Sequence, residues 1–77
     1  MEEKARQLYA AVSKSAVHRE YRDRITFMRG WSGQKVAATL RKACSYAAAH
    51  PEIDFAKIYA HAFSLRINGR IPSISNF

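Results

Sequence analysis

Cysteine and long apolar runs are scarce in this chain of 77 residues. Its single cysteine, Cys44, cannot form an internal disulfide, and one thiol is too few for a multi-cysteine zinc site. No stretch approaches the roughly 18 apolar residues that a membrane span requires. The first residues, 1–4, are not followed by the apolar region of a secretory signal. We therefore expect a cytoplasmic protein with no membrane partner.

Catalytic signatures are equally scarce. The sequence has no glycine-rich phosphate loop, no His-Glu-x-x-His motif and no Gly-x-Ser-x-Gly motif. Its histidines, His18, His50 and His61, fall in three separate helical segments, and their spacing does not indicate a shared metal site. His18 is close in sequence to Glu20 and Arg22, but such a run on a helix is typical of a solvent-exposed face. We expect no enzymatic activity, no catalytic residue and no metal or cofactor.

Acidic residues are also few. Six Asp and Glu stand against thirteen Lys and Arg, which gives a net charge of +7 and a sequence pI near 10.1. An excess this large on a small protein indicates a polyanionic partner such as DNA, RNA or an acidic protein surface. The competing interpretation is that amphipathic helices carry Lys and Arg wherever they face water.

The remaining composition is that of a folded protein. Hydrophobic residues make up 48% of the chain, and one Trp, four Tyr and four Phe argue against disorder. A chain of this length forms a single domain. We predict an all-α fold, a small bundle of three to four short helices over residues 1–69, followed by an extended C-terminal tail over residues 70–77.

Two apolar patterns occupy the first third of the chain. The first predicts a helix over residues 2–12 and consists of Ala5, Leu8, Tyr9 and Val12. The second consists of Val17, Tyr21, Ile25 and Met28. At about 100° per residue the two patterns fall on different faces, so one straight helix cannot bury both against the same core. A break at residues 13–15 with Ser15 as N-cap resolves this conflict. The alternative is one long helix between two partners, which requires a homo-oligomer.

Two further helices are predicted between residues 32 and 68. Gly30 ends the second helix, Ser32 caps the third, and Pro51 stops it. The apolar stripe of the third helix is the clearest in the chain and comprises Val36, Leu40, Ala43, Cys44 and Ala47.

Asp54 is expected to cap a fourth helix that runs to about Asn68. Its apolar residues spread over a wide arc, which predicts extensive burial; they are Phe55, Ile58, Tyr59, Ala62, Phe63 and Leu65. Residues 25–28 have some β propensity, but the helical stripe and the charged neighbours favour a helix there.

Basic side chains form two stripes on the second and third helices. The second helix carries His18, Arg19, Arg22 and Arg29 on one side, and the third carries Lys35, Thr39, Lys42 and Tyr46 at helical spacing. We predict a nucleic-acid-binding module that contacts phosphates through Arg19, Arg22, Arg29, Lys35, Thr39, Lys42 and Tyr46. Tyr46 or Trp31 could stack on an exposed base. The short connection at residues 30–33 suits a helix-turn-helix, but only Gln34 begins the third helix as a base reader would.

A protein-binding regulator is the alternative function. In that case Trp31, the fourth helix and the tail residues Ile71, Ile74 and Phe77 would dock on a larger assembly. Trp31 can be interpreted as a cap on the core or as an exposed anchor. The tail can likewise pack on its own domain or be donated to another chain.

Overall fold

The computed structural model describes residues 2–77, and its secondary structure is helical. The helices are α1 (Glu3–Ser13), α2 (Ala16–Arg29), α3 (Gly33–Ala49) and α4 (Phe55–Ala62). Within residues 2–77 the one β-type pairing is an isolated bridge between Ile67 and Arg70. The predicted all-α bundle is confirmed.

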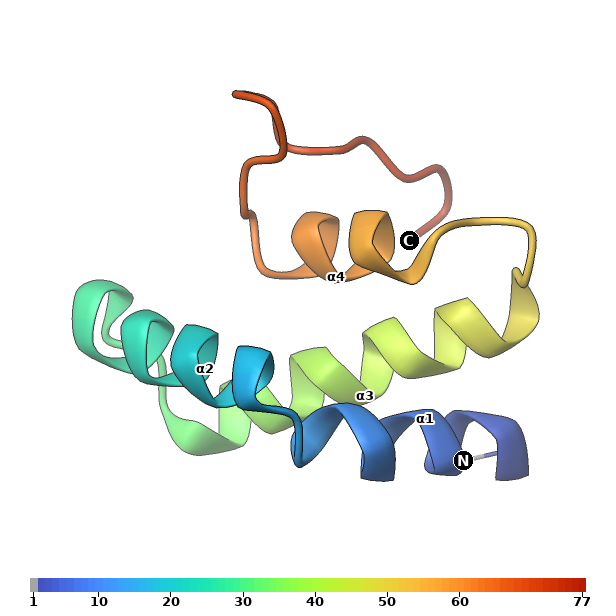
Figure 1. Ribbon diagram of the computed structural model, residues 1–77, viewed down its shortest axis with the longest axis horizontal. Helices are drawn as coiled ribbons and strands as arrows, with labels where there is room; N and C mark the ends of the chain where they lie inside the picture. The colour runs from blue at the N-terminus through green and yellow to red at the C-terminus, as the bar shows by residue number, and fades with distance from the viewer. Residues whose placement is uncertain (1) are drawn as a thin grey trace.

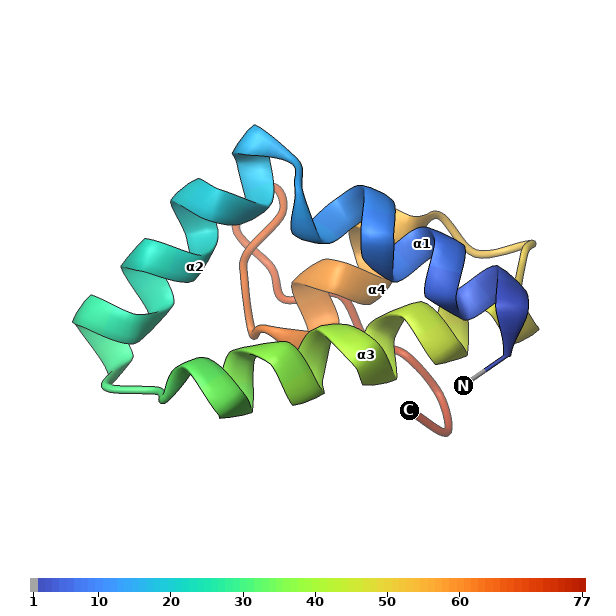
Figure 2. The same cartoon turned by 90° about the horizontal axis from the view of Figure 1, so that it is seen from below.

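The helices form two layers around α3. In Figure 1, α1, α2 and α3 lie in the lower layer, and α4 with the C-terminal segment lies above them. α1 runs alongside α3 in the opposite direction, whereas α2 and α3 diverge from their connection at residues 30–32 (Figure 2). α3 contacts each of the other three helices. α2 and α4 make no close backbone contact anywhere in the described chain.

Local capping chemistry explains where the helices begin. The side chains of Ser15 and Ser32 accept hydrogen bonds of 3.1 Å from the backbone N–H groups of His18 and Lys35. Asp54 Oδ1 accepts one of 3.1 Å from an N–H in the first turn of α4. Each bond satisfies an N–H that has no partner inside the helix. The three N-caps predicted from the sequence are therefore confirmed.

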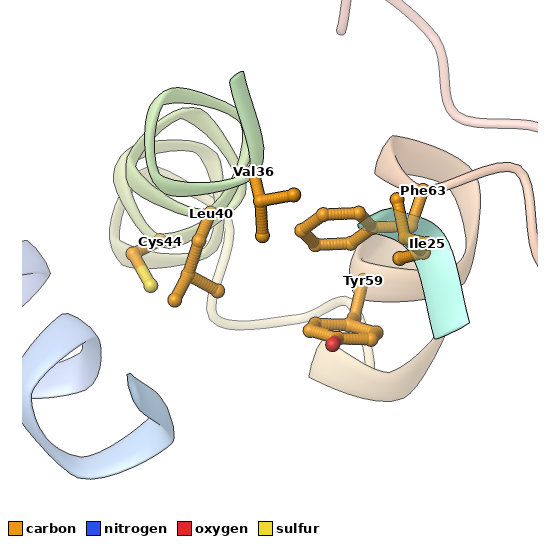
Figure 3. Close-up of a cluster of buried hydrophobic side chains, with 6 residues drawn as sticks. All are labelled: Ile25, Val36, Leu40, Cys44, Tyr59 and Phe63. Atoms are coloured by element: carbon orange, nitrogen blue, oxygen red, sulfur yellow. The ribbon is translucent and has the colours of Figure 1, made fainter. Parts of the chain in front are cut away.

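The core lies where α3 meets α2 and α4. In Figure 3, Val36 of α3 points toward the ring of Phe63, and Ile25 of α2 lies beside that ring. The five residues of the predicted α3 stripe are all buried. Ala5 of α1 is buried, and Leu8, Tyr9 and Val12 pack partly buried against the core. The apolar faces predicted for the first and third helices are confirmed.

The predicted apolar face of α2 needs correction. Ile25 is buried, but Val17 and Met28 are 62% and 76% exposed. His18 is buried instead, because its Nδ1 lies 2.7 Å from the hydroxyl of Tyr59 and so has a polar partner in the core. The expectation that His18 lies on a solvent-exposed face is wrong.

The fourth helix is shorter than predicted: it ends at Ala62 rather than near Asn68. Ser64 adopts a left-handed conformation with φ 54°, its N–H donates to His61 O, and the Leu65 N–H donates to Ala60 O. These two bonds and the left-handed residue form a Schellman motif, which terminates helices. Sequence reasoning missed it because serine occupies the position where glycine is usual.

The chain after α4 turns back over the domain. Asn68 and Gly69 both have positive φ, as a type I′ turn requires, and Ile67 and Arg70 exchange two backbone hydrogen bonds across it. The last residues then return to α3 and α4, where Ile74 and Phe77 pack against Ala43, Ala47 and Ile58. Of the two arrangements foreseen for the tail, the structure has it packed on its own domain.

Candidate nucleic-acid interface

The solvent-exposed side of α3 is cationic and free of acid. Opposite its buried stripe, six exposed residues form what we call the α3 outer face: Gln34, Lys35, Ala38, Arg41, Lys42 and Ser45. Four of them recur at i, i+4, i+7 and i+11, which places them on one side of a helix. Residues 33–49 contain no Asp or Glu. Three positive charges therefore lie on a surface of otherwise small and neutral side chains.

Each cation of the α3 outer face lies over an aromatic ring from another part of the chain. Lys35 Nζ is 4.2 Å from the ring centroid of Trp31, and Lys42 Nζ is 4.9 Å from that of Phe77. The guanidinium carbon of Arg41 is 5.5 Å from the ring centroid of Tyr9.

These cation–π contacts hold the side chains without neutralising their charge. Within the described chain, no carboxylate pairs with Lys35, Arg41 or Lys42, since the ion pairs involve other residues. The three charges are therefore both positioned and available to a polyanion.

Two residues of the predicted α3 stripe lie at the border of this face. Thr39 Oγ1 donates to Lys35 O at 2.8 Å, and the Tyr46 hydroxyl donates to Ser75 O at 2.7 Å. Tyr46 also stacks on His50, with 4.2 Å between ring centroids. Both Thr39 and Tyr46 are half-buried, and Tyr46 lies against the tail residue Phe77. Lys42 also lies over Phe77, so the structure brings Lys42 and Tyr46 to the same aromatic ring.

The predicted α2 cations Arg19, Arg22 and Arg29 are all exposed, but they differ in what they contact. Arg19 and Arg22 are exposed, and Arg22 Nε lies 3.7 Å from an oxygen of Asp23. Arg29 instead donates to the backbone oxygens of Phe63 and Ser64, the latter at 3.0 Å. It thereby satisfies carbonyls at the end of α4. α2 and α3 diverge from their connection (Figure 2). Arg19 and Arg22 therefore do not form one surface with the α3 outer face.

Sequence reasoning overlooked Arg41, Ala38 and Ser45. The stripe predicted from the sequence places Thr39 and Tyr46 beside Lys35 and Lys42, and it is therefore centred toward the side of α3 where Tyr46 contacts the tail. The missing signal was present in the sequence: residues 33–49 lack acid, and Arg41 lies on the side of the helix opposite the apolar stripe.

The residues proposed for protein docking are mostly occupied within the domain. Trp31 is half-buried beside Phe63, with 6.1 Å between the ring centroids, so it caps the core. Phe77 lies against Tyr46, and Ile74 is half-buried. Ile71 is exposed.

Three buried groups have shifted pKa values. Burial, and to a smaller extent the guanidinium of Arg22, lowers the pKa of His18 below its ordinary value of 6.5. Burial, and then the nearby Tyr21, raises the pKa of Tyr59 to about 12. Burial also raises the pKa of the Cys44 thiol to about 11, so this thiol is not an activated nucleophile. His18 is therefore neutral and Tyr59 protonated near neutral pH.

Among residues 2–77, no three His, Cys, Asp or Glu side chains gather as a metal site would require. No helix of this part of the chain has the length and apolar character needed to cross a membrane. Comparison of the chain with protein-family models, curated proteins and solved structures finds no match.

Proposed function

We propose that this protein is a small non-catalytic nucleic-acid-binding module that contacts phosphates through the α3 outer face. The observation that carries the proposal is this acid-free surface, on which Lys35, Arg41 and Lys42 each lie over an aromatic ring. The net charge of +7 adds long-range attraction to a polyanion. Held cations lose little side-chain entropy when they meet phosphates, so this arrangement favours binding.

Duplex DNA is the favoured form of nucleic acid. An exposed helix fits the major groove of B-form DNA, whereas the corresponding groove of duplex RNA is too narrow. Ala38 and Ser45 are small enough to let the backbone of α3 approach the duplex, and Ser45 can also donate to a phosphate oxygen. Single strands are bound mainly by stacking on free aromatic rings. The rings of Trp31 and Tyr46 are half-buried and support other contacts, which favours a duplex.

Arg19 and Arg22 are secondary contacts in this proposal. Both are exposed on α2, outside the α3 outer face, and add to the positive charge that attracts a polyanion. The proposed site of action is the cytoplasm, where the lone thiol of Cys44 would remain reduced.

The test is a salt titration of binding to a labelled duplex of about 20 base pairs, with single-stranded DNA and duplex RNA in parallel, between roughly 50 and 200 mM salt. The variant Lys35→Gln/Arg41→Gln/Lys42→Gln should bind weakly, and its log–log salt slope should be flatter by about 2 to 3, because each lost phosphate contact removes about 0.9. Binding should weaken on every sequence alike, since phosphates carry no sequence information.

A matched control separates the site from the overall charge. The control variant Lys4→Gln/Lys14→Gln/Arg66→Gln also removes three positive charges, but from exposed positions outside α2 and α3. It should keep most of the wild-type slope. The proposal fails if this control loses as much affinity as the α3 variant, or if no nucleic acid is bound at the lowest salt. Circular dichroism of both variants checks that the helices are intact.

A further inference from the structure

A groove opens between α2 and α4, the two helices that lack direct backbone contact within residues 2–77. Its centre is a cavity of about 430 Å³. α2 contributes Val17 and Tyr21 to the walls, α4 contributes Phe55 and Tyr59, and the following segment contributes Leu65 and Ile67. We call this feature the α2–α4 groove.

Two further cavities extend the groove at either end. One of about 190 Å³ shares Tyr21 and Leu65 with the central cavity and reaches Met28. The other, of about 470 Å³, shares Ala56 and Ile67 with it and reaches Arg70. The three hollows therefore follow one another along the surface, and no residue of α3 lines any of them.

Exposed apolar side chains gather along this groove. Five large hydrophobic residues of the described chain are exposed, and three of them line the groove: Val17, Met28 and Ile67. Exposed apolar surface of this kind, concentrated around a hollow, marks an interaction site. Phe27 is 87% exposed but lines none of the three cavities. Phe27 and Met28 are thus adjacent exposed residues of α2, but only Met28 lines the groove.

The charged residues of the groove are predominantly cationic. Lys57, Arg66 and Arg70 line it, and none of them pairs with a carboxylate within residues 2–77. The one acidic residue in its lining, Asp54, caps α4 through the N–H of Ala56. A partner that brings negative charge to this rim would therefore meet unpaired cations.

The floor of the groove offers one polar contact. There the Tyr59 hydroxyl and Nδ1 of His18 share a hydrogen bond of 2.7 Å, in which the donor depends on the tautomer of His18. The other ring nitrogen, Nε2, has no hydrogen-bond partner in the described protein. Because His18 lines the central cavity, its imidazole can offer one polar contact to a partner that enters the groove.

We infer that the α2–α4 groove binds an amphipathic helical segment of a partner protein, with an apolar face against the groove and acidic residues along its flanks. Apolar grooves between helices accept such segments, whose anchors recur at i, i+3, i+4 and i+7. The cationic rim selects acidic flanks and disfavours a second copy of this chain, which also carries +7. A small apolar ligand would fill the central cavity but leave Met28 exposed.

The inference goes beyond nucleic-acid binding, because the groove and the α3 outer face have no residue in common. Both surfaces can therefore be occupied at once. The protein would then join an acidic protein segment to DNA.

The probe is a fluorescein-labelled, designed helical peptide of about 18 residues, with leucines at i, i+3, i+4 and i+7 and glutamates at the exposed positions. Anisotropy is measured without nucleic acid, so the outcome does not depend on the proposed function. We expect saturable binding that weakens with salt, and amide shifts in NMR spectra at Val17 and Tyr21. A second peptide with lysine in place of glutamate should bind at least roughly tenfold more weakly.

Matched variants locate the site. Met28→Glu or Val17→Glu should weaken binding of the acidic peptide at least roughly tenfold, since each adds a like charge at an apolar contact. Phe27→Glu changes the net charge equally on the same helix and should leave the affinity within about twofold. All three positions are exposed, so the substitutions bury no charge, and circular dichroism verifies the helices.

Several outcomes would overturn the inference. Equal binding of the acidic and basic peptides would contradict the role of the cationic rim. If Phe27→Glu weakened peptide binding as much as Met28→Glu or Val17→Glu, the peptide would not be bound in the α2–α4 groove. Absence of peptide binding would refute the docking surface. If dodecanoate produced the NMR shifts and the peptide did not, the groove would be a small-molecule site instead.

Discussion

His18 shows how a single residue can change the interpretation of a whole helix. Because histidine is polar, the sequence predicts that α2 buries the side carrying Val17 and Met28. Both residues are exposed. Its partner Tyr59 lies 41 residues away, and a pairing of that range leaves no periodic signal in the sequence. The burial of Cys44, by contrast, could be predicted, because its stripe on α3 is strictly apolar.

The His18 site should make stability depend on pH. The folded-state pKa of His18 lies below the ordinary value of 6.5, so the unfolded chain binds the proton more tightly. The contribution is present in full above about pH 6.5 and is lost as pH falls toward the lowered folded-state pKa. Urea unfolding at pH 7.5 and 5 should therefore give a lower free energy of unfolding at pH 5.

His18→Gln supplies the comparison. Glutamine retains a hydrogen-bonding side chain but does not titrate, so this variant should lose part of the pH dependence while being less stable overall. An unchanged dependence on pH would mean that His18 is not the titrating group. The pKa of Glu52, lowered by a backbone hydrogen bond and by His50, affects stability below its ordinary value of 4.5, so Glu52 adds little to the change between pH 7.5 and 5.

At the scale of helices, starts were easier to predict than ends. An N-cap is a hydrogen bond between a side chain and a backbone N–H two or three residues later in the chain. Ser15, Ser32 and Asp54 could therefore be recognised from the sequence alone. Gly30, with φ 70°, ends α2 as its conformational freedom predicts. The end of α4 depends on Ser64 adopting a conformation that serine disfavours, supported by the backbone contacts of Arg29. That support comes from the tertiary fold.

Ser64→Gly should stabilise the protein. Glycine adopts the left-handed conformation at φ 54° without the steric cost that serine bears there. We expect the free energy of unfolding to rise by about 0.5–1 kcal/mol, measured by urea denaturation. Ala38→Gly, at an exposed position inside α3, should lower it by about 1 kcal/mol, because glycine is a poor helix former. A loss of stability in both variants would contradict the Schellman motif.

For the whole molecule, composition predicts a class of partner more readily than a surface. The excess of thirteen basic over six acidic residues indicates a polyanion, but the fold decides which cations remain available. Arg29 is directed to the backbone after α4, whereas Arg41 lies on the α3 outer face. The α2–α4 groove could not be foreseen, because it depends on the relative placement of two helices and a turn that are far apart in sequence.

The C-terminal tail provides the last test at this scale. Phe77 lies 5.4 Å from Tyr46 and 5.0 Å from His61, measured between ring centroids, and beneath the ammonium group of Lys42. Phe77→Ala should lower the free energy of unfolding by about 1–2 kcal/mol, less than for a fully buried ring, because Phe77 is half-buried. Affinity for duplex DNA should change by less than about threefold, since the charge of Lys42 remains and a cation–π contact at an exposed site is weak.

Ile71→Ala is the matched control within the tail, and as an exposed residue it should change stability by less than about 0.5 kcal/mol. Urea unfolding of both variants and DNA titrations at fixed salt give the comparison. If Phe77→Ala were as stable as the wild type, the tail would not be an integral part of the domain. It would then be free for donation to a partner, and the arrangement of Lys42 over Phe77 could not contribute to the α3 outer face.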